Sequence, residues 1–154
     1  MMNIVLDDLT GPEIQALLHE HLQDMHTLSQ AESVHALDLE KLRKPDITFW
    51  TIWEDNVLMG CGALKELDSS HAEVKSMRTP AARRGKGAGR AILAHIIAVA
   101  QSRSYQRLSL ETGSHPAFLA AHQLYQSAGF EFCGPFDHYV LDPNSVFMTK
   151  LLKI

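Results

Sequence analysis

The sequence is poor in cysteine, in excess positive charge and in long apolar runs. Its two cysteines, Cys61 and Cys133, cannot form a disulfide framework, so we expect reduced, buried thiols in a cytoplasmic protein. The 14 Lys and Arg residues are outnumbered by 18 Asp and Glu residues, which argues against a nucleic-acid partner. No apolar run is long enough to span a bilayer, and Asp7 and Asp8 lie where a signal peptide would be apolar. We therefore expect no membrane partner either.

The nine histidines form no recognisable metal-binding pattern. His19 and His21 are two residues apart on a predicted helix, so they cannot face one site. His115 and His122 are two helical turns apart, but no third ligand is evident nearby. Neither an H-E-x-x-H string nor a Cys/His cluster occurs, so the sequence predicts no metal site.

The 154 residues are enough for one domain with a sizeable core, and we assign residues 1–154 to a single domain. Apolar and β-branched patterns separated by turn residues predict alternating strands and helices. Three successive strands should form an antiparallel meander, and the strand–helix–strand unit after it should be a right-handed parallel crossover. The predicted strands are 3–6, 47–53, 57–67, 73–78, 107–112, 130–133 and 146–152, and the predicted helices are 12–25, 34–42, 88–102 and 116–128.

Three glycines at alternate positions, Gly85, Gly87 and Gly89, precede an apolar run with helical spacing. Without Cβ atoms, the backbone there can approach a ligand closely. The glycines lie where a helix begins, and the free N–H groups and positive dipole end at such a position bind anions, most often phosphate. The cationic residues around this loop are Arg78, Arg83, Arg84, Lys86 and Arg90.

The loop could also be a flexible turn before an ordinary helix, and its spacing excludes two other phosphate-binding motifs. No G-x-x-x-x-G-K-[ST] string occurs, and Arg90 occupies the third glycine position of a G-x-G-x-x-G fingerprint. The string Arg84-x-x-Gly87-x-Gly89, after a predicted strand, resembles the acyl-coenzyme A loop of the GNAT N-acetyltransferase family. The string L-Y-x-x-x-G-F at 124–130 resembles the segment that closes the same fold. The resemblance covers essentially the whole chain and is greatest to small bacterial members.

The resemblance implies a single α/β domain with a mixed, largely antiparallel sheet, a central splayed parallel strand pair and about four flanking helices. It implies an acyltransferase that moves acetyl from acetyl-CoA to an amine, on a small molecule or a protein N-terminus, directly in a ternary complex. Cys61 lies between glycines with no histidine placed to activate it, so a ping-pong route is disfavoured. A non-catalytic acyl-CoA sensor and a purely structural module are the alternatives. Relatives are often homodimers, so a second copy is a possible partner.

By the same resemblance, backbone N–H groups of residues 84–89 would hold the coenzyme diphosphate, with Arg84 and Lys86 adding charge-assisted bonds. The backbone of Met77 and Thr79 would pair with the pantetheine amides, and the Met77 N–H would face the thioester oxygen. Many members have asparagine where this chain has Phe118, which would make an apolar contact instead. The full predicted coenzyme-binding set is Met77, Arg78, Thr79, Arg84, Gly85, Lys86, Gly87, Ala88, Gly89, Arg90 and Phe118.

Tyr125 is the candidate general acid, because the resemblance places its hydroxyl near the coenzyme sulfur; the alternative is an aromatic core residue. Glu73 is the candidate general base, acting on the amine proton through water. Strand alternation predicts Glu73, Lys75 and Met77 on one face of the sheet. The alternative for Glu73 is a strand glutamate that pairs with Lys75, and Glu111 on the parallel neighbour is the competing base.

His26, His35, His138 and Tyr139 lie in connections that line the acceptor cleft in this fold, although each could be an ordinary surface group. We take His26, His35, Glu111 and Tyr139 as the candidate acceptor-binding residues. The sequence does not identify the acceptor, because no strongly acidic or basic stretch marks a peptide or polyamine cleft.

Overall fold

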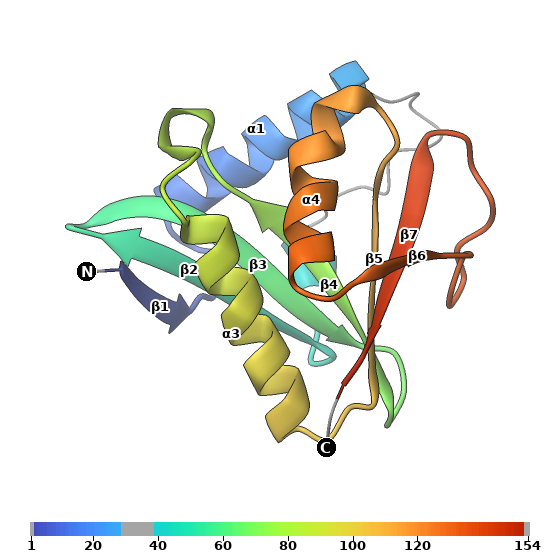
Figure 1. The fold of residues 1–154 in the computed structure, drawn as a ribbon. Helices are drawn as coiled ribbons and strands as arrows, with labels where there is room; N and C mark the ends of the chain where they lie inside the picture. Colours follow the sequence, from blue (N-terminus) through green and yellow to red (C-terminus); the bar gives the residue numbers. More distant parts are fainter. Residues whose placement is uncertain (1, 29–38, 153–154) are drawn as a thin grey trace.

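The computed structural model describes residues 2–28 and 39–152, which build one seven-stranded sheet (Figure 1). The strands lie in the order β1-β2-β3-β4-β5-β7-β6. Only β4 and β5 are parallel, and every other neighbouring pair is antiparallel. The mixed sheet with one central parallel pair confirms the predicted fold class. The strands are β1 (Met2–Leu6), β2 (Ile47–Glu54), β3 (Val57–Glu66), β4 (His71–Arg78), β5 (Arg107–Gly113), β6 (Glu131–Cys133) and β7 (Ser145–Leu151).

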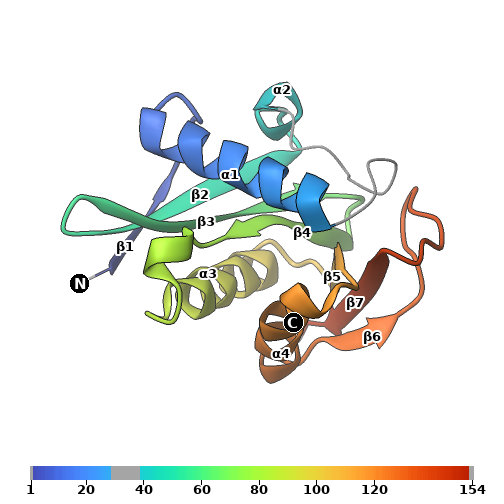
Figure 2. The same cartoon turned by 90° about the horizontal axis from the view of Figure 1, so that it is seen from above.

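Helices cover both faces of the sheet. Figure 2 shows α1 (Pro12–Leu28) and α2 (Leu39–Leu42) on one face, and α3 (Ala88–Ser102) and α4 (Leu119–Ser127) on the other. The predicted helix at Pro116 begins as a 3-10 turn, Pro116–Phe118, that continues into α4. Among the described residues, no helix is long and apolar enough to cross a membrane.

Each face of the sheet has its own hydrophobic core. On the α3 side the core includes Ile92, Leu93 and Ile96, which belong to the apolar run from which this helix was predicted. The α1 side buries Ile14 and Leu17 in a second cluster. Burying a side chain of this size stabilises the fold by about 1.5–3 kcal/mol, so the two stripes fix both helices on the sheet.

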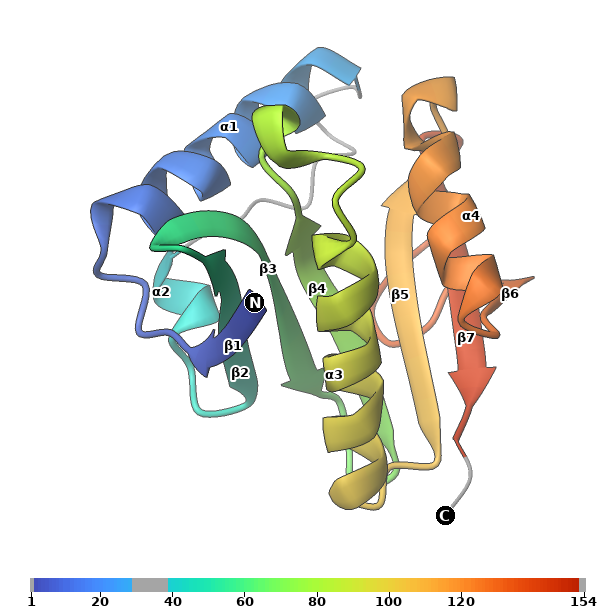
Figure 3. The ribbon, with the colours of Figure 1, turned by 60° about the vertical axis from the view of Figure 1, so that its left-hand side comes forward.

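The parallel pair separates after three pairings. His71, Ala72 and Glu73 pair with Arg107, Leu108 and Ser109, respectively, and no later residues of the two strands pair. Beyond that point β5 stays paired with β7 as far as Gly113, whereas β4 stays with β3 as far as Arg78. Figure 3 shows the two strands diverging toward their carboxyl ends. We call the region between 74–78 of β4 and 110–113 of β5 the β4–β5 opening.

A β-bulge in β4 changes which side chains share a face. The pairing with β3 moves from Ala63–Lys75 to Cys61–Arg78, so β4 uses one residue more than β3, and Ser76 has a positive φ of 57°. Met77 consequently packs against the α3-side core. The expectation that Met77 would share a face with Glu73 and Lys75 was therefore wrong, because strict alternation fails at a bulge.

The two cysteines differ in exposure. Cys61 is buried, and its Sγ donates to the Ser76 carbonyl oxygen at 3.1 Å. Cys133 is exposed on β6, contrary to the expectation of two buried thiols, because β6 is the edge strand of the sheet.

Candidate active site

The glycine loop leaves the start of α3 open. Gly85 and Gly87 have φ values of 79° and 88°, and an added Cβ at either would meet nothing within 4 Å. Gly87 is the N-cap of α3 and makes no side-chain capping bond. The helical hydrogen-bond ladder begins with Ala91 N–H donating to the Gly87 carbonyl at 3.0 Å. An α-helix has no intrahelical partner for its first N–H groups, so these donors are available to an anion.

The basic residues around the loop have different roles. Arg84, Lys86 and Arg90 are exposed, as electrostatic binding of a diphosphate requires. Arg78 instead directs its guanidinium to α1, where Nη2 lies 3.1 Å from Glu20 Oε1. The same Glu20 oxygen accepts from the Ala81 N–H at 3.4 Å, so this carboxylate ties the end of β4 and the start of the loop to α1.

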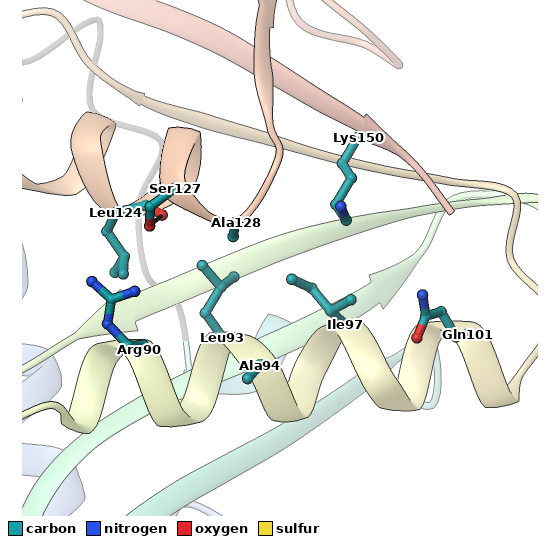
Figure 4. A pocket seen from close by; sticks show the side chains of 9 residues that line it. All are labelled: Arg90, Leu93, Ala94, Ile97, Gln101, Leu124, Ser127, Ala128 and Lys150. Atoms are coloured by element: carbon teal, nitrogen blue, oxygen red, sulfur yellow. Dashed lines mark hydrogen bonds between the residues drawn. The ribbon is translucent and has the colours of Figure 1, made fainter. Parts of the chain in front are cut away.

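A cavity of about 380 Å³ lies between α3 and α4 (Figure 4). Its middle is apolar, and it has one cationic side chain from α3 and another from β7. The lining residues are Arg90, Leu93, Ala94, Ile97, Gln101, Leu124, Ser127, Ala128 and Lys150. Of the predicted coenzyme-binding residues, Arg90 therefore belongs to this cavity as well as to the end of the loop.

Glu73 lies where the parallel strands stop pairing and is only 1% exposed. The Tyr139 hydroxyl donates to its Oε2 at 2.6 Å, and Lys75 Nζ lies 3.6 Å from the same oxygen. Its Oε1 is buried and has no hydrogen-bond partner within the described part of the chain. Glu73 thus makes the Lys75 ion pair expected of a structural glutamate, while one oxygen remains available for a ligand.

Tyr139 comes from the connection 134–144 between β6 and β7. Its ring packs against Phe136 and Phe147, with centroids 5.1 and 5.5 Å apart, and stacks on His138 at 4.9 Å. Burial and then the charge of Glu73 raise the pKa of Tyr139, so its hydroxyl is protonated and donates at neutral pH. The sequence placed Tyr139 among acceptor contacts but gave no sign of its bond to Glu73, and it did not single out Phe136.

Tyr125 is buried on α4, with its ring edge-on to Phe130 at a centroid distance of 5.9 Å. Burial, and to a lesser degree the charge of Glu111, raises the pKa of Tyr125 above the usual value of 10.0. The phenol therefore stays protonated across the neutral range, as a proton donor must. Glu111 itself accepts from the Ser145 hydroxyl at 2.6 Å.

Two predicted coenzyme contacts pack within the protein through their side chains. The Phe118 ring lies on Gly113 at the end of β5, so closely that a Cβ at position 113 would overlap it. The Thr79 hydroxyl lies near Gly60 of β3 and Gly89 of α3. The side chain of Thr79 thus fills the junction between β3 and α3.

His35 and the side chain of His26 lie outside the described residues, so their predicted roles stay predictions. Burial raises the pKa of the Cys61 thiol to about 12, which makes it a poor nucleophile at neutral pH. In the part of the chain that is described, no three His, Cys, Asp or Glu side chains are grouped so that they could hold a metal ion.

Residues 14–130 match the model of the acetyltransferase (GNAT) family. The uncharacterized N-acetyltransferase YsnE of Bacillus subtilis is 57% identical over 151 residues, which cover 98% of this chain and 100% of that protein. A putative acyl-CoA N-acyltransferase structure from Klebsiella pneumoniae has a TM-score of 0.80 and 29% identity, and covers 99% of both chains. A GNAT acetyltransferase from Elizabethkingia anophelis, solved with acetyl-CoA bound, has a TM-score of 0.69 at 17% identity and covers 98% of both chains.

Proposed function

The chain belongs to the GNAT acetyltransferase family and is an acyltransferase, and from this premise we propose that it transfers acetyl from acetyl-CoA to an amine within a ternary complex. The observation that carries the proposal is the β4–β5 opening. Paired parallel strands would leave no free backbone groups there, whereas separated strands leave a row of them for the pantetheine amides.

The coenzyme would be held along three neighbouring features. The N–H groups of the loop 84–89 and the start of α3 bind the diphosphate, and Arg84 and Lys86 add charge. The pantetheine arm runs into the β4–β5 opening beside the backbone of Met77 and Thr79. The nucleotide extends toward the cavity between α3 and α4, where Arg90 and Lys150 supply positive charge. The acetyl-CoA bound to the Elizabethkingia neighbour supports this choice of donor.

In the proposed chemistry the neutral amine attacks the thioester carbon, so a C–N bond forms and the C–S bond breaks. Glu73 takes the proton that the amine loses, and Tyr125 donates its proton to the departing thiolate. The Met77 N–H stabilises the oxyanion that develops on the thioester oxygen. Holding donor and acceptor together makes the step effectively intramolecular, which can lower the barrier by about 7–11 kcal/mol.

The acceptor would approach from the α1 side of the sheet, where Glu73, Lys75 and Tyr139 lie together. A small-molecule amine and a protein N-terminus both meet the chemical requirement, since each offers a neutral amine to a buried carboxylate. The alternative, a non-catalytic acyl-CoA sensor, gives no reason for a buried Glu73 at the strand separation whose Oε1 has no partner among the residues that the structure describes.

The test is thiol release from acetyl-CoA with a panel of small amines and short peptides. We expect the protein to release free coenzyme A with at least one acceptor. Glu73→Gln should lower kcat by about 10²–10⁴-fold, the usual contribution of a general base, and leave coenzyme affinity unchanged. A protein that binds acetyl-CoA but releases no thiol with any acceptor would be the sensor.

A further inference from the structure

The two oxygens of Glu73 are in unequal surroundings. Oε2 accepts from Tyr139 at 2.6 Å and faces Lys75 Nζ at 3.6 Å, whereas Oε1 has no donor among the described residues although it is buried. Buried polar atoms in native proteins nearly always have a partner, and leaving one without a partner destabilises the fold. A buried oxygen that finds no donor in residues 2–28 and 39–152 is best explained by a partner that arrives with the substrate.

We infer that Tyr139 is a positioning residue for the reaction: its hydroxyl fixes the Glu73 carboxylate through Oε2 so that Oε1 is the oxygen that receives the amine proton. The inference rests on the proposed function, because it assigns the base role to Glu73. It replaces the sequence expectation that Tyr139 contacts the acceptor directly.

The surroundings of Tyr139 suit this role. Its ring is held from three sides by Phe136, Phe147 and His138, so the hydroxyl has little freedom to leave the carboxylate. It is 9% exposed, and its raised pKa keeps it a donor. The connection between β6 and β7 thereby supports a residue of β4 that lies 66 positions earlier in the chain.

Several charged or titratable groups lie around this pair. Lys75 and His71 belong to β4, Glu111 to β5 and Asp137 to the β6–β7 connection. Lys75 Nζ also donates to the Tyr139 hydroxyl at 3.5 Å, so the lysine and the tyrosine together hold Oε2 of Glu73. Loss of the tyrosine donor leaves Lys75, at 3.6 Å, as the remaining polar contact of that oxygen, so the carboxylate is held less firmly.

The experiment compares Tyr139→Phe with Tyr105→Phe. Tyr105 is a matched control, because it is also buried and its hydroxyl donates to a glutamate, Glu66, at 2.5 Å, away from the β4–β5 opening. For Tyr139→Phe we expect kcat to fall roughly tenfold or more, a part of the 10²–10⁴-fold effect of a general base. The KM for acetyl-CoA should stay the same, because Tyr139 holds the base and not the coenzyme. Tyr105→Phe should match the unmodified protein in both kcat and KM.

The possible failures are distinguishable. If Glu73→Gln is inactive but Tyr139→Phe keeps the original kcat, the positioning role is wrong and the proposed function stands. If Glu73→Gln is fully active, the base assignment fails and the role of Tyr139 fails with it. A fall in kcat of Tyr139→Phe together with a higher KM for acetyl-CoA and a lower melting temperature would also overturn the inference, since a merely structural role gives that result. The melting temperatures of both tyrosine variants, measured alongside, should equal that of the unmodified protein, because the ring packing that supports the fold is retained.

Discussion

Glu73 and Ser109 are the last residues that pair across β4 and β5, and the two strands separate immediately beyond them. The carboxylate proposed as the base therefore lies at the closed end of the β4–β5 opening, and the glycine loop follows the far end of β4. A thioester drawn into the opening from the loop would point toward Glu73. The strand pairing thus connects the anion site with the proposed base.

Gly87→Glu should abolish coenzyme binding. The new side chain would place a carboxylate at the amides of the first turn of α3. Because residue 87 has a φ of 88°, any side chain there also adds backbone strain of about 1–2 kcal/mol. The measurement is the rise in melting temperature on adding coenzyme A, which should disappear. Gly134→Glu adds the same charge at a glycine with no positive φ and nothing within 4 Å, and should keep the ligand-induced rise. If coenzyme A raised the melting temperature of Gly87→Glu as much as that of the unmodified protein, the proposed anion site would be wrong.

Tyr125→Phe should lower kcat by about a hundredfold while the affinity for coenzyme A stays the same. A general acid must be protonated, and burial raises the pKa of Tyr125 above 10.0. Its ionisation would reduce the rate only above that raised value, so the profile of kcat should show no alkaline fall from this group up to pH 10. An unchanged kcat of Tyr125→Phe would contradict the acid assignment, whereas an alkaline limb below pH 9 that vanishes in this variant would contradict the raised pKa of Tyr125.

Alkylation should distinguish the two cysteines. Burial raises the pKa of Cys61 to about 12, so it is a thiol, not a thiolate, at pH 8. Iodoacetamide at that pH should label the exposed Cys133 and spare Cys61, and the labelled protein should keep its transferase activity. Intact mass after incubation with acetyl-CoA should show no acetyl-enzyme. An acetyl group found on Cys61 would contradict direct transfer and support a ping-pong route.

Substitutions at Ser76 should report on the bulge in β4. Ser76 has a φ of 57°, and its buried hydroxyl has no hydrogen-bond partner in residues 2–28 and 39–152. Ser76→Gly should raise the free energy of unfolding by up to about 1 kcal/mol, because glycine accepts this conformation without strain. Ser76→Val should lower it by about 2 kcal/mol, because a β-branched residue is strained there. Urea unfolding measures both, and equal stability of the two variants would argue against the bulge.

The sequence predicted the sheet, the helices that begin at Pro12, Ala88 and Pro116, and the glycine loop, because each depends on a local pattern; residues 34–38 of the predicted helix 34–42 lie outside the described residues. The apolar stripe of Ile92 and Ile96 and the glycines before it can be recognised without knowing what they pack against. The order of strands around β4 and β5 followed from chain connectivity and the handedness of the crossover.

The sequence did not predict features that depend on exact register or on distant contacts. Nothing in 71–78 marks the bulge at Ser76, so the face of Met77 was predicted wrongly. The bond from Tyr139 to Glu73 joins residues 66 positions apart through a connection without regular structure. The exposure of Cys133 depends on β6 being an edge strand, which follows from the order β5-β7-β6 and not from local composition.

The central claim is that coenzyme A occupies the β4–β5 opening with its diphosphate on the amides at the start of α3. Amide hydrogen–deuterium exchange with and without coenzyme A, read by mass spectrometry, tests it most directly. We predict slower exchange in residues 77–79 and 84–90 on adding the coenzyme, and no change in β1. Unchanged exchange in both of those segments, with protection appearing elsewhere in the chain, would contradict the account.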